Sequence, residues 1–190
     1  MPSSIIVHGG AGQVTPDRHD RLREGVRRAA AAGDAILVGG GSALDAVVAA
    51  VRVLEDDPEF NAGTGSALTR DGTVETDASV MDGPTQRVGA VAAVPDLGNA
   101  IALARAVLDR GEHVILSGRP AWHFAAEVGI TPAPPGALVV ERARVRLKSE
   151  LARLANPSDR SGDNSGGTVG AVARDHAGRF AAATSTGGIV

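Results

Sequence analysis

Apolar residues recur along the chain at two spacings, and the spacing separates helices from strands. From His19 to Val38, and again after Ser42, they return every three or four residues, which predicts two amphipathic helices. Ser42 stands three positions before Asp45, so the second helix has a capping-box-like start. The same helical spacing predicts further helices over residues 99–108, 121–128 and 139–154.

Shorter apolar runs bounded by turn residues predict strands. They cover residues 5–7, 66–69, 73–76, 88–94, 168–175 and 179–185. Asp71-Gly72 favours a tight turn, so the runs on either side of it are expected to pair as a hairpin, and a second hairpin is expected around His176-Ala177-Gly178. The run over 88–94 has little polarity on either face, which is typical of a central strand. Together these elements predict the α+β class.

The composition fits a single globular domain over residues 1–190. Of the 190 residues, 43% are hydrophobic and 22% are charged, which allows a sizeable core. With three Phe, one Trp and no Tyr, that core must consist of small and branched aliphatic side chains. The formal net charge of -3, with acids and bases mixed, indicates no surface for nucleic acid or an anionic membrane, so small-molecule or peptide partners are favoured.

Several kinds of site are excluded or disfavoured. The chain has no cysteine, which excludes disulfides and thiolate chemistry, and its five histidines show no metal-ligand spacing. Residues 2–12 lack the pattern of a secretory signal and no segment reaches transmembrane length, so a cytoplasmic protein is expected. The arginine-rich residues 139–154 also contain Glu141 and Glu150, which favours a solvated helix face over a nucleic-acid surface.

Thr168 has an unusual position, directly after the polar, glycine-rich linker 156–167 and directly before a buried strand. Cleavage before it would expose an α-amino group, whose reference pKa of roughly 7.7–8.0 lets it act as a general base near neutral pH. Because Thr is stiff at its first side-chain torsion, its hydroxyl would point in a fixed direction. The pattern alone also fits an ordinary threonine at the start of a strand.

Other motifs favour the nucleophile. In chain order they are His8-Gly9-Gly10-Ala11-Gly12, Asn61-Ala62-Gly63-Thr64-Gly65-Ser66, Asp71-Gly72 with Glu75 and Asp77, Met81-Asp82-Gly83, Gly167-Thr168-Val169-Gly170-Ala171-Val172 and Ser185-Thr186-Gly187-Gly188. This series resembles the successive signatures of the isoaspartyl peptidase/L-asparaginase family, which are plant-type asparaginases of the N-terminal-nucleophile hydrolase class. The resemblance extends over the whole chain.

The resemblance implies a four-layer αββα sandwich and a precursor that cuts itself between Gly167 and Thr168. Residues 1–167 would form the α subunit, including the linker 156–167, and residues 168–190 would begin the β subunit. A dimer of αβ units is expected. The chain would be truncated at its C-terminus, because relatives continue beyond Thr186-Gly187-Gly188 through an arginine and an aspartate that hold the substrate and a Thr-Gly pair that forms the oxyanion hole.

The resemblance also assigns site residues. Thr168 is the nucleophile, the hydroxyl of Thr186 interacts with it, Asn61 lies close to the site, and Gly187 and Gly188 border the substrate. Two structural alternatives remain: Thr186 as an ordinary residue at the end of a strand, and Asn61 as a residue that satisfies its own loop.

No cofactor is required by the family, but the loop 54–64 resembles its sodium-binding loop. There, mainly backbone carbonyls hold the ion, and the matching residues are Leu54, Glu55, Asp57, Phe60, Ala62 and Thr64. Oxygen ligands suit a hard cation. Since every loop contains carbonyls, a loop without an ion remains the alternative.

The implied activity is hydrolysis of isoaspartyl (β-aspartyl) peptides and L-asparagine through a covalent acyl-enzyme. Two alternatives stay open. One is a glycosylasparaginase, which shares the fold and the nucleophile, and the other is an inactive truncated member that acts as a binding or assembly module. Phosphate binding at His8 to Gly12 is disfavoured, because no P-loop lysine followed by Ser or Thr occurs at the required spacing.

Overall fold

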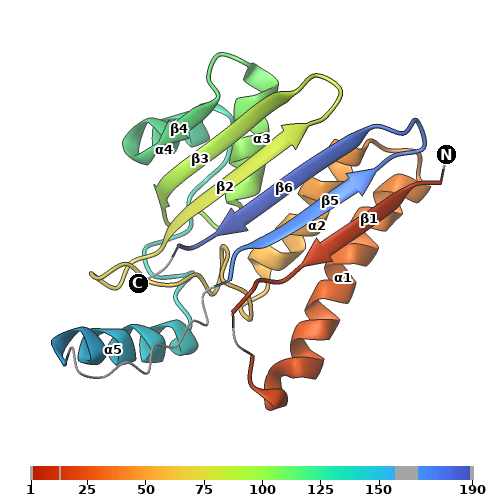
Figure 1. Cartoon of the computed structure of the whole chain (residues 1–190). Helices are drawn as coiled ribbons and strands as arrows, with labels where there is room; N and C mark the ends of the chain where they lie inside the picture. The colour runs from red at the N-terminus through yellow and green to blue at the C-terminus, as the bar shows by residue number, and fades with distance from the viewer. Residues whose placement is uncertain (1, 13, 157–166, 189–190) are drawn as a thin grey trace.

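In the computed structural model, which describes residues 2–12, 14–156 and 167–188, one sheet has the strand order β1-β5-β6-β2-β3-β4 (Figure 1). The strands are β1 Ser4–His8, β2 Glu75–Asp82, β3 Arg87–Pro95, β4 Ile115–Ser117, β5 Val169–Arg174 and β6 Phe180–Thr186. All neighbours pair antiparallel except β3 and β4. The two strands that come last in the chain therefore lie inside the sheet, between β1 and β2.

The helices cover one face of this sheet. They are α1 His19–Val38, α2 Ala43–Asp56, α3 Ala100–Arg110, α4 Gly118–Glu127 and α5 Glu141–Ala155, with a short 3-10 helix at Pro16–Arg18. Helix α1 packs on β1, α2 on β5 and β6, and α3 on β2 and β3, while α5 lies beyond the end of the sheet (Figure 1). Among the described residues the opposite face has no covering layer, and Ile6 on it is 75% exposed.

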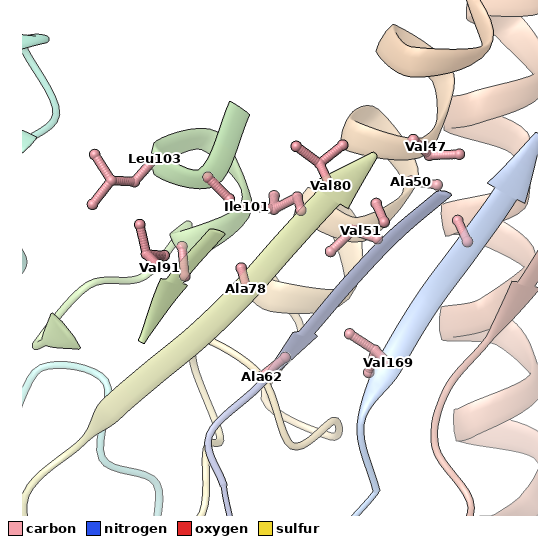
Figure 2. Packing of buried hydrophobic residues seen from close by; sticks show 14 of the residues in the cluster. Val47, Ala50, Val51, Ala62, Ala78, Val80, Val91, Ile101, Leu103 and Val169 are labelled. Atoms are coloured by element: carbon pink, nitrogen blue, oxygen red, sulfur yellow. The ribbon is translucent and has the colours of Figure 1, made fainter. Parts of the chain in front are cut away.

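Helix α2 shows how the sequence builds the core. The Ser42 side chain accepts a hydrogen bond from the Asp45 amide at 3.1 Å and so caps the first turn, as the sequence predicts. The apolar side of the helix is buried against β5 and β6, where Val51 lies near Val169 in a cluster of small aliphatic side chains (Figure 2). Burying such side chains contributes about 1.5–3 kcal/mol each, so this face anchors the centre of the sheet.

Small residues let the layers approach closely. A Cβ on Gly89 of β3 would lie only 2.7 Å from the Leu108 Cβ of α3, so no larger residue fits between strand and helix there. Gly33 of α1 is similarly placed, because a Cβ on it would come within 2.9 Å of the Ala46 carbonyl oxygen of α2. The close approach expected from a core with few aromatic residues is thus present.

The five predicted helices are confirmed, and α1 has the predicted bounds. The hairpin predicted around Asp71-Gly72 was wrong in extent, because only an isolated bridge joins Leu68 to Val74. Beyond it the chain enters β2, which pairs with β3 and β6 instead. The run 88–94 does form a strand, but β3 lies next to the edge strand β4 and not at the centre. Most of the linker 156–167 lies outside the described residues.

Candidate functional site

Thr168 and Thr186 lie side by side at one end of the β5–β6 hairpin. The ladder between these strands runs from Arg174 opposite Phe180 to Val169 opposite Ser185, so the next residues in register are the two threonines. Side chains alternate along a strand, and Val169 and Ser185 are fully buried beneath the sheet. The two threonine hydroxyls therefore belong to the bare face, where Thr168 is exposed and Thr186 is half-buried.

Thr186 ends β6 and is followed by a turn that engages its hydroxyl. The Gly188 amide donates a hydrogen bond to Thr186 Oγ1 at 3.2 Å, and Gly188 has a φ of 74°, which glycine adopts without strain. On the other side of β6, Asp77 of β2 is the cross-strand neighbour of Thr186. The carboxylate of Asp77 accepts a hydrogen bond from the Ala93 amide at 2.7 Å and so braces a bulge in the β2–β3 ladder.

Asn61 connects the loop after α2 to this turn. Its side-chain amide donates to the Gly188 carbonyl at 2.8 Å, and its Oδ1 accepts from the Ala67 amide at 2.7 Å. Its own carbonyl accepts from the Gly187 amide at 3.2 Å. Asn61 thus satisfies its own loop, as the structural alternative expects, and it also holds both glycines that follow Thr186.

The residue before Thr168 is held by a close backbone contact. A Cβ on Gly167 would lie 2.7 Å from the Gly10 Cα, and a Cβ on Gly10 would lie 2.9 Å from the Gly167 Cα. Gly10 also has a φ of 117°. Only glycine fits either position, so the glycine-rich turn after β1 fixes the backbone that enters Thr168.

A buried carboxyl group lies beneath the same end of β6. Ser185 donates to Glu55 Oε1 at 2.6 Å, and the Ile101 amide at the start of α3 donates to the same oxygen at 3.0 Å. Glu55 is fully buried and its Oε2 has no hydrogen-bond partner among the described residues. Burial raises the pKa of Glu55 to about 8, because these two hydrogen bonds only partly offset the loss of hydration.

The loop 54–64, where the sequence predicts a sodium ion, is closely packed around two glycines. A Cβ on Gly63 would meet the Glu55 carbonyl oxygen at 2.5 Å, and a Cβ on Gly65 would meet the Phe60 carbonyl oxygen at 2.9 Å. Both glycines have positive φ. The Glu55 carbonyl already accepts the Thr64 amide at 2.8 Å and retains one lone pair. Close packing at the two glycines thus fixes the backbone of this loop.

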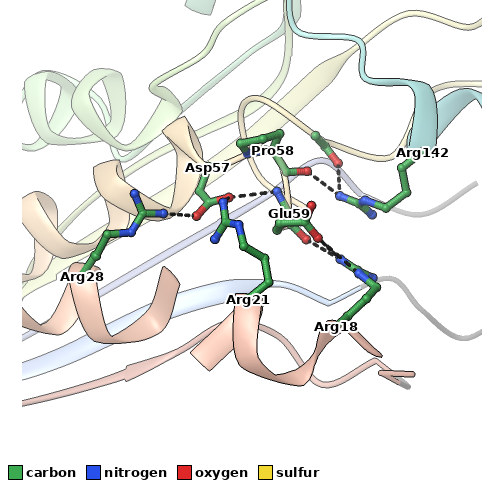
Figure 3. A network of polar contacts seen from close by, with 8 residues as sticks. Arg18, Arg21, Arg28, Asp57, Pro58, Glu59 and Arg142 are labelled. Carbon is green, nitrogen blue, oxygen red and sulfur yellow. Dashed lines mark hydrogen bonds and ion pairs between the residues drawn. The ribbon is translucent and has the colours of Figure 1, made fainter. Parts of the chain in front are cut away.

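The side chain of Asp57 forms ion pairs within the protein. It is almost fully buried and accepts ion pairs from Arg21 and Arg28 of α1, so it fastens the loop to that helix (Figure 3). Next to it, Glu59 pairs with Arg18 at 2.7 Å. No cluster of three or more His, Cys, Asp or Glu suited to a metal ion occurs within residues 2–12, 14–156 and 167–188.

The roles predicted for the two threonines, Asn61 and the loop 54–64 stay predictions, and sequence reasoning missed two features of this region. It considered Glu55 only for its carbonyl, although a carboxyl group on the apolar face of a helix is a signal that it needs a buried partner. It also interpreted Arg142 only as part of a solvated helix face, although the Arg142 side chain donates a hydrogen bond to the Pro58 carbonyl (Figure 3).

In the described part of the chain, no helix is both long and apolar enough to span a bilayer.

The family match and the relatives found by comparison with known proteins agree with one another. Residues 1–190 match the family described as "Asparaginase". The isoaspartyl peptidase/L-asparaginase of Bos taurus is 51% identical over 192 aligned residues, and that of Homo sapiens is 49% identical over 191, each match covering 100% of this chain. The isoaspartyl peptidase of Salmonella typhimurium is 41% identical over 195 residues, covering 97% of this chain. The chain spans 62% of the length of each of these relatives.

Proposed function

Because the chain belongs to the asparaginase family, we propose that it carries the nucleophile of a self-cleaving threonine hydrolase that acts on isoaspartyl peptides and L-asparagine. The observation that carries this proposal is the register that sets Thr168 beside Thr186 at the end of the β5–β6 hairpin. The close contact of Gly167 with Gly10 supports it, since it holds the residue on the carbonyl side of the bond to be cut.

Self-cleavage proceeds through an acyl shift. The Thr168 hydroxyl oxygen attacks the Gly167 carbonyl carbon, the Gly167–Thr168 C–N bond breaks, and Gly167 becomes esterified to Thr168. Water then hydrolyses the ester. The products are a carboxylate on Gly167 and a free amine and hydroxyl on Thr168, with one water consumed. Residues 1–167 become the α subunit, and the β subunit begins at Thr168.

Hydrolysis of substrate uses the same hydroxyl. The new α-amine of Thr168 takes the hydroxyl proton as the oxygen attacks the side-chain amide, and ammonia or an amine leaves as the acyl-enzyme forms. Thr186 lies next to the nucleophile, where its hydroxyl can donate to the Thr168 oxygen. Asn61 holds Gly187 and Gly188 at the border of the substrate site. Water completes the cycle by hydrolysing the acyl-enzyme.

The bare face of the sheet supports the four-layer αββα sandwich. Ile6, Val172 and Phe180 expose apolar side chains there, at 75%, 49% and 55%, and a second sheet with its own helices would bury them. In relatives of greater length, that layer would come from the part that this chain does not match. It would supply the groups that hold the substrate and the oxyanion, and two αβ units would pair as a dimer.

A structural sodium ion in the loop 54–64 is part of the proposal. The closely packed backbone of this loop supports it, and the proposed ligands are the main-chain oxygens of Leu54, Glu55, Asp57, Phe60, Ala62 and Thr64. The ion would stabilise the loop that carries Asn61 and would take no part in the chemical steps. A hard cation held by neutral carbonyls fits a structural role.

The test is the intact mass of the natural full-length protein, followed over time beside Thr168→Ala and Thr168→Ser. We expect the parent to split between residues 167 and 168, the serine variant to split more slowly, and the alanine variant to stay whole. A parent that stays whole would overturn the proposal.

Substrate assays then separate the alternatives. The processed protein is expected to hydrolyse a β-aspartyl dipeptide and L-asparagine. Preference for a glycosylated asparagine would indicate a glycosylasparaginase, and cleavage without any hydrolysis would indicate a binding or assembly module.

A further inference from the structure

A small pocket of about 40 Å³ lies beside the residue that precedes Thr168. Gly167 and the glycine-rich turn at Gly9 and Gly10 form one wall, and Arg18 and Arg142 form another. By the usual measure of roughly 10–15 Å³ per water molecule, the pocket has room for a group the size of a carboxylate. Its position makes it the nearest described cavity to the bond that the proposed self-cleavage breaks.

The charges around this pocket are unbalanced. Arg18 is paired with Glu59, and Asp57 is paired with both Arg21 and Arg28 (Figure 3). No ion pair joins Arg142 to a carboxylate among the residues that the structure describes. In the described part of this cluster, four arginines face the two carboxylates of Asp57 and Glu59, and Arg142 has neither within ion-pair distance.

Arg142 is bound by backbone carbonyls only. Its Nη2 donates to the Pro58 carbonyl at 2.7 Å and approaches the Gly65 carbonyl at 3.5 Å (Figure 3). Its Nε is buried and has no partner within the described part of the chain. Burial and then Arg18 lower the pKa of the Arg142 guanidinium, while Glu59 opposes them in part. The guanidinium has five N–H donors, and an anion in the pocket that Arg142 lines would accept from one that the Pro58 and Gly65 carbonyls do not use.

We propose that this pocket is a carboxylate site, in which Arg142 binds the C-terminus that self-cleavage creates on Gly167. The inference rests on the proposed function, because only cleavage supplies this anion. When the Gly167–Thr168 bond has been replaced by a carboxylate and an amine, the Gly10 contact keeps residue 167 beside the pocket. A charge-assisted hydrogen bond from Arg142 then holds the severed end of the α subunit away from the amine of Thr168.

The experiment measures the accessibility of that end in the processed full-length protein. After cleavage is complete by intact mass, a carboxypeptidase is added and the loss of Gly167 from the α subunit is followed by mass spectrometry. The variants are Arg142→Met, which removes the charge, and Arg142→Lys, which restores it. Arg144→Met is the matched control, since Arg144 is exposed on the same helix.

We expect Gly167 to be removed at least ten-fold faster from Arg142→Met than from the parent and from Arg144→Met, with Arg142→Lys between them. Equal rates in all processed variants would overturn the carboxylate site and leave the proposed function intact. A parent that never cleaves would overturn both. If Arg142→Met raises KM for a β-aspartyl dipeptide without changing the trimming rate, the pocket binds a substrate carboxylate and the inference fails.

A second measurement needs no variant at this position. The carboxyl of Gly167, labelled with carbon-13, can be titrated by NMR in the processed parent. We expect its pKa to lie below the value of roughly 3.3–3.7 that is usual for a chain terminus, because the arginine stabilises the anion. A pKa within that range would overturn the inference even if Arg142→Met fails to fold.

Discussion

The two ends of the β5–β6 hairpin are held in opposite ways. At the turn end, Asp175 accepts hydrogen bonds from the amides of Ala177 and Arg179 and pairs with the Arg179 side chain, all within five residues. At the end that carries Thr168 and Thr186, the partners are distant in sequence. Ser185 and Glu55 are 130 positions apart, and Gly188 and Asn61 are 127 positions apart.

This difference shows where the reactive geometry comes from. The turn end is held mainly by contacts within five residues, with one backbone hydrogen bond to Asp175 from Ala43 at the start of α2. The reactive end depends on the packing of α2 and its following loop, so its shape exists only when the whole sheet has assembled. Substitutions at the reactive end should therefore cost more free energy of unfolding than substitutions at the turn.

The largest effect is expected for Glu55→Ala. It removes the shared acceptor of the Ser185 hydroxyl and the Ile101 amide and leaves a cavity. We expect a loss of about 3–4 kcal/mol in the free energy of unfolding, measured by urea denaturation. Glu55→Gln keeps an oxygen acceptor and should lose less than about 1 kcal/mol. An equal loss in both variants would contradict the role of that acceptor.

Gly187→Ala comes next. A Cβ there would overlap the Ser66 side chain and lie 2.7 Å from its Cα, and neither strand end nor loop can move freely. We expect a loss of about 2–3 kcal/mol by the same measurement. Gly98→Ala is the control, because a Cβ there would make an ordinary contact with Leu138 at 3.6 Å. Equal losses of free energy of unfolding in the two variants would show that the close packing around Gly187 does not contribute to stability.

At the turn end, Asp175→Asn should have a smaller and pH-dependent effect. Burial would raise the pKa of Asp175, but hydrogen bonds from Arg179 outweigh it and the pKa falls below its usual value. The carboxylate therefore contributes stability that is complete above about pH 4 and is lost as the pH falls through the lowered pKa. We expect the variant to be about 1 kcal/mol less stable at pH 7. That difference should shrink towards pH 2, and a constant difference would contradict the assignment.

The smallest effect is expected for Arg179→Met. The Arg179 side chain is 55% exposed in its pair with Asp175, and exposed pairs contribute little. Thermal unfolding at pH 7 should show a loss of less than about 1 kcal/mol. A loss of free energy of unfolding as large as that of Glu55→Ala would show that the two ends of the hairpin contribute equally to stability.

The same contrast explains what could be predicted from sequence. The helical spacing of apolar residues was sufficient to predict the bounds of α1, and Ser42 correctly predicted the start of α2, because both signals are local. Strand β2 was missed because Asp71-Gly72 suggested a nearer hairpin, although Thr76, Ala78 and Val80 alternate as buried positions. Motifs identified Thr168 and Thr186, whose roles remain predictions. The partner of Ser185 was not found, since no local pattern joins residues so far apart.

The order of the strands has a consequence for when the protein can mature. Because β5 and β6 fill the space between β1 and β2, both older strands keep an unpaired edge until the last hairpin has been synthesised. The proposed cut before Thr168 would therefore follow the insertion of that hairpin between β1 and β2. The proposed cut would not free the hairpin, since continuous ladders to β1 on one side and β2 on the other would retain it without a covalent link.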